Sequence, residues 1–416
     1  MNQSKTFCMH PFTGLATRED GKIQVCCRSH PIGDITENTL EEIWNNETIQ
    51  RIRTQVLNNE RPSECEPCFM LEDQGVESLR QRHIKGEIPE ARINLYPNTK
   101  FEKILPFEIP TMELKLNNLC NLKCRMCHPG DSTSWNDWDQ VEFFYKKENN
   151  IIVKIVEEHN LKRKPYLDKF EDNPNWWDSF EKNLPNFRRV EFAGGEPLMD
   201  PQHYRILDML KPYANQIQLK YATNLTMLGK GNRTVHEYWP HFKSIAVNIS
   251  IDGYGPSYEY IRGNAKWETL IENIKEIQKF SNIDRIVGAV AVQVSNICVI
   301  PKMIEYFLNE LGIVFYVNMV KYPECLSVQA LPNMLKDDMT LRLVQARDQI
   351  ANYKLVQQHP ILQKITETQI NNIINYMNSK DRYEELWQDT INFNMNLDVT
   401  RNQSFTDVNP EFKPYV

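Results

Sequence analysis

Three closely spaced cysteines are the residues of this sequence best suited to metal chemistry. The segment LNNLCNLKCRMCHPG places Cys120, Cys124 and Cys127 in a C-x3-C-x2-C pattern. Thiolates are the soft ligands that iron-sulfur clusters require, and a cubane cluster has four corners, so three thiols leave one iron free to hold another molecule. The alternative is a structural zinc site with His128 as the fourth ligand, although the adjacent Cys127 and His128 fit poorly into one tetrahedron.

A second group of cysteines lies in the N-terminal part of the chain. Cys65 and Cys68 form a C-x2-C pair, and Cys8 and Cys26 precede it. Clustered cysteines in a large chain bind metal more often than they form disulfides, and a four-cysteine zinc site fits this pattern. The cysteines outside both groups are Cys27, Cys298 and Cys325. For the last two, a small buried hydrophobe is the ordinary alternative to a catalytic thiol or hydrogen-atom donor.

Two further segments carry polar groups directly after apolar runs. In FAGGEPL, Gly194 and Gly195 allow the backbone to approach a ligand closely, and Glu196 can accept a hydrogen bond from an ammonium group. In NISIDG, the two-residue spacing of Ser250 and Asp252 puts both side chains on one face of a strand. Each segment alone is an ordinary turn or strand end, so its meaning depends on the cysteine pattern that precedes it.

From Thr111 onward, short apolar runs alternate with helix-length stretches, and these elements must position the reactive groups. Such alternation is typical of parallel βα units. Active sites form in the loops at the carboxyl ends of barrel strands, where the cysteine segment falls. The predicted fold class is α/β, with a partial (β/α)6 barrel of the TIM type over residues 111–330. The predicted strands are 112–117, 189–193, 217–223, 245–252, 286–294 and 312–320.

Other regions flank or interrupt this barrel. Residues 1–90 are polar and turn-rich, include a predicted helix over 39–57, and form a small N-terminal module. Residues 91–110 carry three prolines and are expected to be a linker. A helical elaboration is expected over 128–188. Residues 331–416 are expected to form a helical extension that ends in an extended tail.

Composition argues against two classes of partner. The chain has 416 residues and a formal net charge of -7, with Lys and Arg interspersed among Asp and Glu, so it lacks the basic face that binds nucleic acid. No apolar run reaches the roughly 18 residues of a membrane span, and the start MNQSKTFCMHPF lacks the layout of a secretory signal. We therefore expect a soluble, cytoplasmic protein without nucleic-acid or membrane partners.

The three-cysteine pattern, followed by GGEP and SID in barrel order, resembles the signature of the radical S-adenosylmethionine (radical SAM) superfamily. The resemblance implies that Cys120, Cys124 and Cys127 hold a 4Fe-4S cluster whose open iron binds SAM. The SAM contacts that it implies are Gly194, Gly195 and Glu196 for the amino group, Ser250 and Asp252 for the ribose, Asn224 in YATNLT close to the cofactor, and Arg262 in YIRG for the carboxylate. For Arg262, an ordinary salt bridge within the loop is an equal alternative.

The N-terminal segments FCMHPF, GKIQVCCRSHPIGDI and CEPCF resemble the auxiliary-cluster modules called SPASM and twitch domains. Gly21, Ile23 and Cys26 match the first part of their pattern. These modules usually follow the barrel, whereas this one precedes it. The ligands of a second 4Fe-4S cluster implied by the resemblance are Cys8, Cys26, Cys65 and Cys68. Cys27 remains an alternative to Cys26, and zinc remains an alternative metal.

The resemblance also implies an activity, in which SAM is reductively cleaved to a 5'-deoxyadenosyl radical that abstracts hydrogen from a substrate. The expected substrate is a peptide or protein side chain. A small metabolite is the alternative substrate, and a non-catalytic zinc or iron-sulfur relay or scaffold is the alternative function. The expected electron donor is a flavodoxin or ferredoxin, and no catalytic acid or base stands out. Candidate substrate contacts are Lys115, Gln293, Tyr316 and Asn318, although a hydrogen bond to a local partner is the more ordinary role for each of them.

Overall fold

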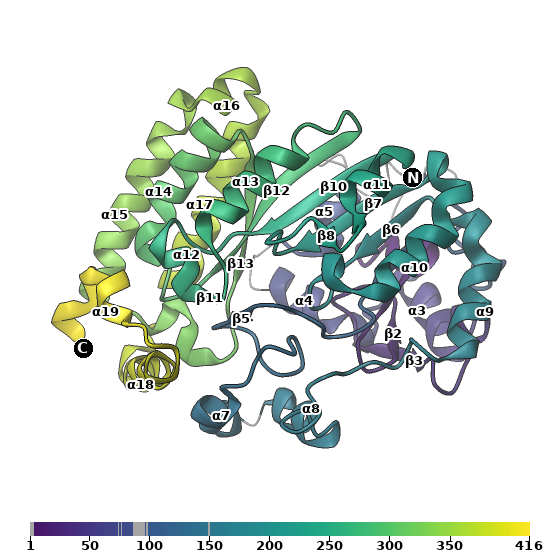
Figure 1. Cartoon of the computed structure of the whole chain (residues 1–416), viewed down its shortest axis with the longest axis horizontal. Helices are drawn as coiled ribbons and strands as arrows, with labels where there is room; N and C mark the ends of the chain where they lie inside the picture. Colours follow the sequence, from purple (N-terminus) through teal and green to yellow (C-terminus); the bar gives the residue numbers. More distant parts are fainter. Residues whose placement is uncertain (1–3, 74, 76, 86–95, 97–98, 149) are drawn as a thin grey trace. The chain divides into compact units, whose positions relative to one another are not determined.

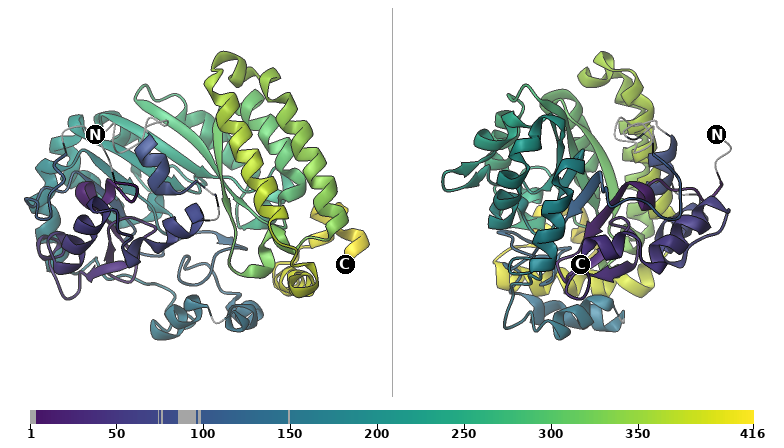
Figure 2. Two further views of the ribbon diagram at one scale, coloured as in Figure 1. Left: turned by 180° about the vertical axis from the view of Figure 1, so that it is seen from behind. Right: turned by 90° about the vertical axis from the view of Figure 1, so that its right-hand side faces the viewer.

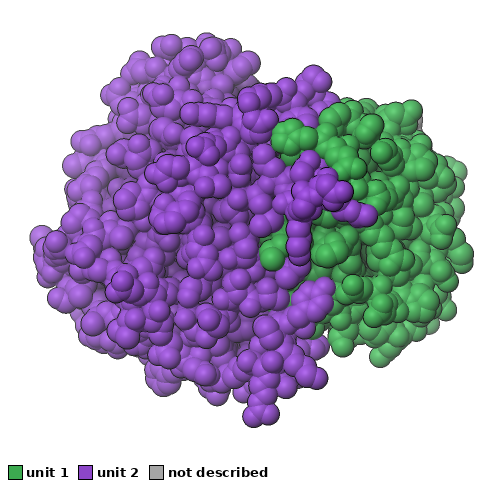
Figure 3. Space-filling model, viewed as in Figure 1, with its two compact units in different colours: residues 1–118, 167–221, 235–245 green, residues 119–166, 222–234, 246–416 purple. Residues whose placement is uncertain are grey.

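The computed structural model describes residues 4–73, 75, 77–85, 96, 99–148 and 150–416. The chain divides into two compact units, shown in different colours in Figure 3. The first unit comprises residues 1–118, 167–221 and 235–245, and the second comprises residues 119–166, 222–234 and 246–416. Part of the predicted linker, at 91–95 and 97–98, lies outside the described residues.

The first unit is built on six strands in the order β7, β6, β4, β1, β2, β3. Strands β7, β6, β4 and β1 pair in parallel, and β2 and β3 continue the sheet in antiparallel pairs. Their bounds are β1 Gly14–Thr17, β2 Lys22–Gln24, β3 Pro31–Asp34, β4 Thr111–Leu114, β6 Arg189–Phe192 and β7 Gln218–Thr223. The boundary of the first unit falls within β7, after Tyr221. The apolar runs predict β4, β6 and β7, and the structure confirms these strands.

Strand β1 pairs the N-terminal segment with the first predicted barrel strand. Ala16 lies opposite Glu113 in the parallel register of β1 and β4. The buried Thr17 hydroxyl accepts a hydrogen bond from the Lys115 N–H at 2.7 Å and donates one to the Lys115 carbonyl at 3.0 Å. Strand β1 is not predictable from the sequence, because its four residues, GLAT, are too few to show a strand period.

Two helices replace the single helix that was expected over residues 39–57. Asn46 adopts an extended backbone and accepts a hydrogen bond from the Ile49 N–H, which ends α2 and caps α3. Thr39 and Glu42 form a capping box at the start of α2. The helices of the first unit are α1 His10–Thr13, α2 Leu40–Trp44, α3 Glu47–Leu57, α4 Glu66–Asp73, α5 Leu79–Lys85, α9 Pro174–Asn183, α10 Pro201–Leu210 and α11 Val235–Tyr238.

The sheet of the second unit contains the other three predicted strands, in the order β13, β12, β10. Strands β12 and β13 are parallel, with Val287 opposite Val314 and Val292 opposite Met319. Two short antiparallel pairs, β5 with β11 and β8 with β9, lie outside this sheet. The bounds are β5 Lys123–Cys124, β8 Gly229–Lys230, β9 Arg233–Thr234, β10 Ser244–Ser250, β11 Arg262–Gly263, β12 Ile283–Val292 and β13 Val314–Met319. The second unit contains β10 from Ala246 onward.

Helices form the rest of the second unit. Helix α17 packs against β13, and α15 packs against both α17 and α14; Figures 1 and 2 show these helices side by side. The helices are α7 Trp138–Lys147, α8 Ile151–Glu158, α12 Pro256–Ile261, α13 Trp267–Ile277, α14 Ile300–Tyr306, α15 Asn333–Gln349, α16 Lys354–Gln358, α17 Ile361–Asn378, α18 Tyr383–Arg401 and α19 Phe405–Val408. No helix among the described residues is long and apolar enough to span a membrane.

The tail of the chain is helical, so the prediction of an extended tail is wrong. Ser404 caps α19 by accepting a hydrogen bond from the Asp407 N–H, and a 3-10 helix follows. Phe412 is fully buried and stacks on Phe405 with 5.0 Å between the ring centroids. Burial of these aromatic rings favours a compact helical tail over an extended one.

We predict that Thr17→Val weakens the first unit, because the buried backbone groups of Lys115 lose their hydroxyl partner. The expected loss is about 1 to 3 kcal/mol of unfolding free energy. Urea unfolding of the iron-free protein, followed by tryptophan fluorescence, measures this loss. The control is Thr368→Val, because that hydroxyl is exposed and donates only to the Lys364 carbonyl of its own helix. Equal stability of the two variants would contradict the prediction.

Candidate cofactor sites

Four cysteines of the first unit line one pocket, and they are Cys8, Cys26, Cys65 and Cys68. Cys8 lies just before α1, Cys26 follows β2, and the other two belong to a 3-10 turn and to α4. The pocket encloses about 410 Å³, including space that is open to solvent. Among the described residues, Cys27 is not part of its lining.

The thiols of this pocket influence one another electrostatically. Desolvation and the neighbouring Cys8 raise the pKa of Cys26 to about 12. The pKa of Cys65 is also raised, first by desolvation and then by Cys8, Cys26 and Cys68. Thiols gathered in this way resist ionisation until a cation binds, because a metal stabilises the thiolate form. Four thiols around one pocket therefore fit the donor set of a 4Fe-4S cluster.

Cys27 interacts with charged groups at the end of β4 and just after it. Its pKa is raised, chiefly by desolvation and then by Glu113 and Cys26, while Lys115 opposes the rise. The chain turns at Cys26 and Cys27, and of these two residues only Cys26 lines the pocket. This geometry separates two cysteines that the sequence left as alternatives.

A buried ion pair fixes one wall of the cysteine pocket. Arg80 lines the pocket, and its guanidinium pairs with Glu72. Its Nη1 also donates to the carbonyl of Phe7 at 2.8 Å, which holds the residue before Cys8 in place. The pocket is thus supported by α5 as well as by the segments that carry its cysteines.

In the second unit, the loop with the C-x3-C-x2-C pattern is held by short backbone pairings. Lys123 and Cys124 form β5, which pairs with β11. The Cys127 N–H donates to the Cys124 carbonyl at 3.1 Å, and the indole Nε1 of Trp135 donates to the same carbonyl at 2.7 Å. Cys120 and Cys124 are buried, and Cys127 is half-buried. The loop therefore has a defined backbone around its central cysteine.

Cys124 and Cys127 are hydrogen-bonded through their thiols. This bond and the positive charge of Arg262 lower the pKa of Cys124, against the effect of desolvation. The pKa of Cys127 is raised, first by the same bond and then by desolvation. Cys120 is linked to this region by Asn224, whose Nδ2 lies 3.9 Å from the Cys120 Sγ. Three thiols on one loop fit the donor set of a cluster with one open iron.

The histidine next to the third thiol has other contacts. The Nδ1 of His128 accepts a hydrogen bond from the Gly130 N–H at 3.1 Å, and its Nε2 lies 3.3 Å from Asp131. Neither nitrogen is directed to the thiols in this arrangement, which disfavours a Cys3His zinc site. Among the described residues, no group of three or more His, Cys, Asp or Glu side chains could hold a single metal ion. In a cluster each thiolate binds its own iron, so the thiols need not converge on one point.

Asp252 and Arg262, which were predicted separately as SAM contacts, bind each other. The Arg262 Nη2 lies 2.6 Å from the Asp252 Oδ2, and Asp252 is fully buried. The Asp252 Oδ1 accepts a hydrogen bond from the Ala291 N–H at 2.6 Å. Burial raises the pKa of Asp252, and Arg262 opposes the rise. Arg262 also donates from Nη1 to the Cys124 Sγ at 3.5 Å, so the pair connects the end of β10 to the cysteine loop.

Asn224 contacts the cysteine loop in a second way, because its Nδ2 donates to the Asn121 Oδ1 at 3.0 Å. Its Oδ1 accepts hydrogen bonds from the backbone and the hydroxyl of Thr226. Ser250 lies at the end of β10 and is half-buried. The second unit thus brings the loop, Asn224, Asp252 and Arg262 together.

The predicted GGE motif follows β6 in the first unit. Gly194 has φ +103°, and a Cβ there would lie 3.0 Å from the Asn117 carbonyl, so this position requires glycine. The Gly195 N–H donates to the same carbonyl at 3.4 Å. Glu196 is buried, and its Oε1 accepts from the Leu198 N–H at 3.0 Å. The motif is therefore a tight turn against the end of β4.

Among the candidate substrate contacts, Gln293 has the least usual environment. Its amide is fully buried after β12, and neither Oε1 nor Nε2 has a hydrogen-bond partner among the described residues. Tyr316 and Asn318 are half-buried on β13, whereas Lys115 belongs to the first unit. A buried amide without partners costs about 1 to 3 kcal/mol, so Gln293 is suited to contact a bound molecule.

Arg125 is the residue of this site that the sequence analysis missed. It lies directly after Cys124, is fully buried, and stacks on Tyr260 with 3.6 Å from its Cζ to the ring centroid. A charged residue within a loop is ordinarily exposed, so no sequence signal distinguishes it.

Solved chains that are distantly similar to this one include SuiB and TYW1. Two crystal structures of SuiB from Streptococcus suis, one bound to the precursor peptide SuiA and one to S-adenosylmethionine, are 12% and 13% identical, with TM-scores of 0.34 and 0.33. They cover 84% and 83% of this chain and 70% and 71% of their own. A structure of TYW1 with a lysine-pyruvate adduct is 14% identical and has a TM-score of 0.28; the match covers 58% of this chain and 71% of that one. No curated protein matches the sequence significantly.

Two family models match the sequence directly. Residues 114–303 match the radical SAM superfamily, and residues 8–69 match SPASM, an iron-sulfur cluster-binding domain. The first match contains the three-cysteine loop, and the second contains the four cysteines that line the pocket. The cofactors of these families are S-adenosylmethionine, a 4Fe-4S cluster and an auxiliary iron-sulfur cluster. The chain therefore belongs to the radical SAM superfamily and carries an N-terminal SPASM domain.

Proposed function

We propose that Cys120, Cys124 and Cys127 hold the SAM-cleaving 4Fe-4S cluster of this enzyme, and that it abstracts hydrogen from a peptide or protein side chain. When bound, the cluster and SAM supply the electron and the radical for this chemistry. The observation that carries the proposal is the three-thiol loop, which lies within the radical SAM match. A 4Fe-4S cluster held by three thiols would keep one iron open for SAM.

The chain's own residues position this loop and its surroundings. Arg262 donates to the Cys124 thiol and stabilises its anionic form. Asp252 fixes the guanidinium of Arg262. The proposed role of Asp252 is therefore to orient Arg262 beside the cysteine loop as well as to contact SAM. Ser250 is proposed to bind the ribose and Asn224 to lie close to SAM. Gln293 offers a buried donor and acceptor to a bound molecule.

In the first unit, Gly194, Gly195 and Glu196 are proposed to receive the amino group of SAM. The positive φ of Gly194 turns the chain between the end of β6 and Glu196. Cys8, Cys26, Cys65 and Cys68 are proposed to ligate the auxiliary cluster, because they share one pocket. Full ligation by four thiolates suits electron transfer or a structural role.

The substrate class rests on the SPASM domain, because the sequence resembles peptide-maturing enzymes with auxiliary clusters. One SuiB structure contains a bound precursor peptide. The proposal retains two expectations from sequence, a flavodoxin or ferredoxin as electron donor and a cytoplasmic location.

We predict that Cys124→Ala removes about four of the about eight iron atoms expected for two 4Fe-4S clusters, and abolishes formation of 5'-deoxyadenosine. The measurement is iron content and product formation after anaerobic reconstitution, with SAM and a strong reductant. Cys298→Ala is the matched control, because Cys298 lies outside both cysteine groups. Product formation by the Cys124 variant would refute the assignment.

We predict that Cys26→Ala loses the auxiliary cluster, whereas Cys27→Ala retains it, because of these two cysteines only Cys26 is among the described residues that line the pocket. The two substitutions remove the same group from adjacent positions, so each is the control for the other. Iron content and the electron paramagnetic resonance (EPR) signal of the reduced protein distinguish them. The opposite pattern would assign the ligand to Cys27, and zinc in place of iron would overturn the auxiliary cluster.

A further inference from the structure

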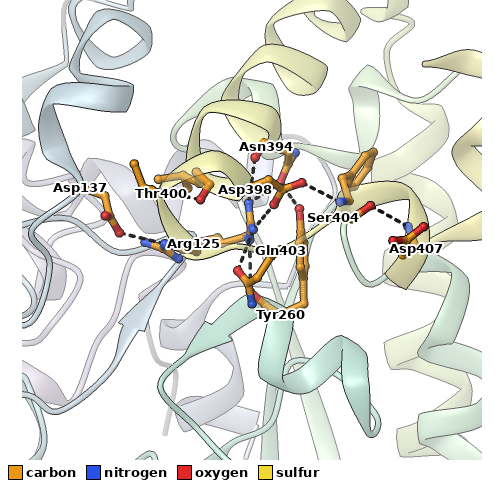
Figure 4. Close-up of polar contacts among 12 residues, drawn as sticks. Arg125, Asp137, Tyr260, Asn394, Asp398, Thr400, Gln403, Ser404 and Asp407 are labelled. Carbon is orange, nitrogen blue, oxygen red and sulfur yellow. Dashed lines mark hydrogen bonds and ion pairs between the residues drawn. The ribbon is translucent and has the colours of Figure 1, made fainter.

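Arg125 connects the three-cysteine loop to the C-terminal helix α18. Its Nη2 lies 2.5 Å from the Asp398 Oδ1 and 3.0 Å from the Gln403 Oε1, and its Nη1 donates to the Asn394 Oδ1 at 3.2 Å. Figure 4 shows these side chains around the guanidinium, with Tyr260 beside it. Three polar partners of Arg125 therefore come from α18 and from the turn that follows it.

The same region of the C-terminal extension also holds the backbone before Cys124. Arg401, the last residue of α18, donates from Nη1 to the Lys123 carbonyl at 2.8 Å. Its Nε donates to Asp137 at 2.8 Å, and both Arg401 and Asp137 are buried at their side chains. Contacts from residues 394–403 thus reach the residue before Cys124 and the residue after it.

Asp398 is itself fixed from the other side. Its Oδ2 accepts a hydrogen bond from the Phe405 N–H at 2.6 Å, at the start of α19. Arg125 is fixed too, because its N–H donates to the Ile261 carbonyl at 2.8 Å. A buried charge is tolerated only when it is paired and hydrogen-bonded. The loop is therefore restricted to the few arrangements in which Arg125 reaches Asp398 and its other acceptors.

From this geometry we infer that α18 is part of the catalytic cluster site, with Asp398 as the positioning residue that fixes the cysteine loop through Arg125. Neither residue is proposed as a cluster ligand; both act on the backbone that carries Cys124. Groups that orient metal ligands typically change metal retention when they are removed. The inference rests on the proposed function, because it takes this loop to be the cluster site.

The experiment measures how fast a ferrous chelator strips iron from the reconstituted full-length protein. Two clusters should give two phases, and Cys124→Ala identifies the catalytic phase by abolishing it. In Asp398→Asn, we expect the catalytic phase to become about 10- to 100-fold faster and the auxiliary phase to stay unchanged. We also expect shifted EPR g values for the catalytic cluster.

The matched control is Asp389→Asn, the same chemical change on the same helix. Asp389 pairs with the exposed Lys147 of α7 and has no contact with Arg125. We expect this variant to strip at the wild-type rate. An unchanged catalytic phase in Asp398→Asn, or an equally fast one in Asp389→Asn, would overturn the inference. If Cys124→Ala abolishes neither phase, the proposed function itself fails, which is a distinct outcome.

A double variant separates positioning from fold stability. Replacement of a buried ion pair by apolar residues is often neutral or stabilising for folding, so Arg125→Met with Asp398→Leu should fold. The catalytic phase should nevertheless remain fast, because the loop has lost its anchor. Restoration of the wild-type rate would show that the pair serves folding alone. Gln403→Ala, which removes one outer partner of Arg125, should give a smaller acceleration of the same phase, and no acceleration would contradict the inference.

Discussion

The burial of one positive charge, on Arg125, is the constraint on which the three-cysteine loop depends. Its side chain has no exposure, so every hydrogen bond that water would supply must come from the protein. The carboxylate that balances it, on Asp398, lies 273 residues further along the chain. Because neither group is stable in the interior alone, the loop and the end of α18 must reach their final structure together. Another buried pair, Asp252 with Arg262, places a further guanidinium beside the same loop.

Much of the fold could be predicted from the sequence because strands with buried faces have a readable pattern. All six predicted strands are present, and β12 is found within three residues of the expected start and two of the expected end. The missed β1 is stabilised by its pairing with β4, which local composition does not show. The helix over 39–57 splits because a single asparagine competes successfully for the backbone N–H of Ile49. The helical tail has no local signal in the sequence, because the contact between Phe405 and Phe412 depends on tertiary burial.

The candidate site was predictable only as separate motifs. Spacing identifies the cysteine groups, but it does not choose between Cys26 and Cys27, since the choice depends on how the turn after β2 places the two side chains. Likewise, Asp252 and Arg262 each match a family motif, and nothing in either motif indicates that the two side chains pair. Arg125 was not predictable at all. Its burial follows from partners far away in sequence, and such partners leave no local pattern.

The pairing of β1 with β4 has a consequence for the order of events during synthesis. Thr17 is translated 98 residues before Lys115, the residue whose backbone its hydroxyl binds. At ribosomal rates of about 5 to 20 residues per second, the edge of β1 that pairs with β4 stays unpaired for roughly 5 to 20 seconds, until β4 has been synthesised. Unpaired strand edges are prone to wrong pairings, so the nascent N-terminal domain is exposed during this interval. When a SPASM domain follows its barrel in sequence, the strands of the barrel are synthesised before the SPASM domain is.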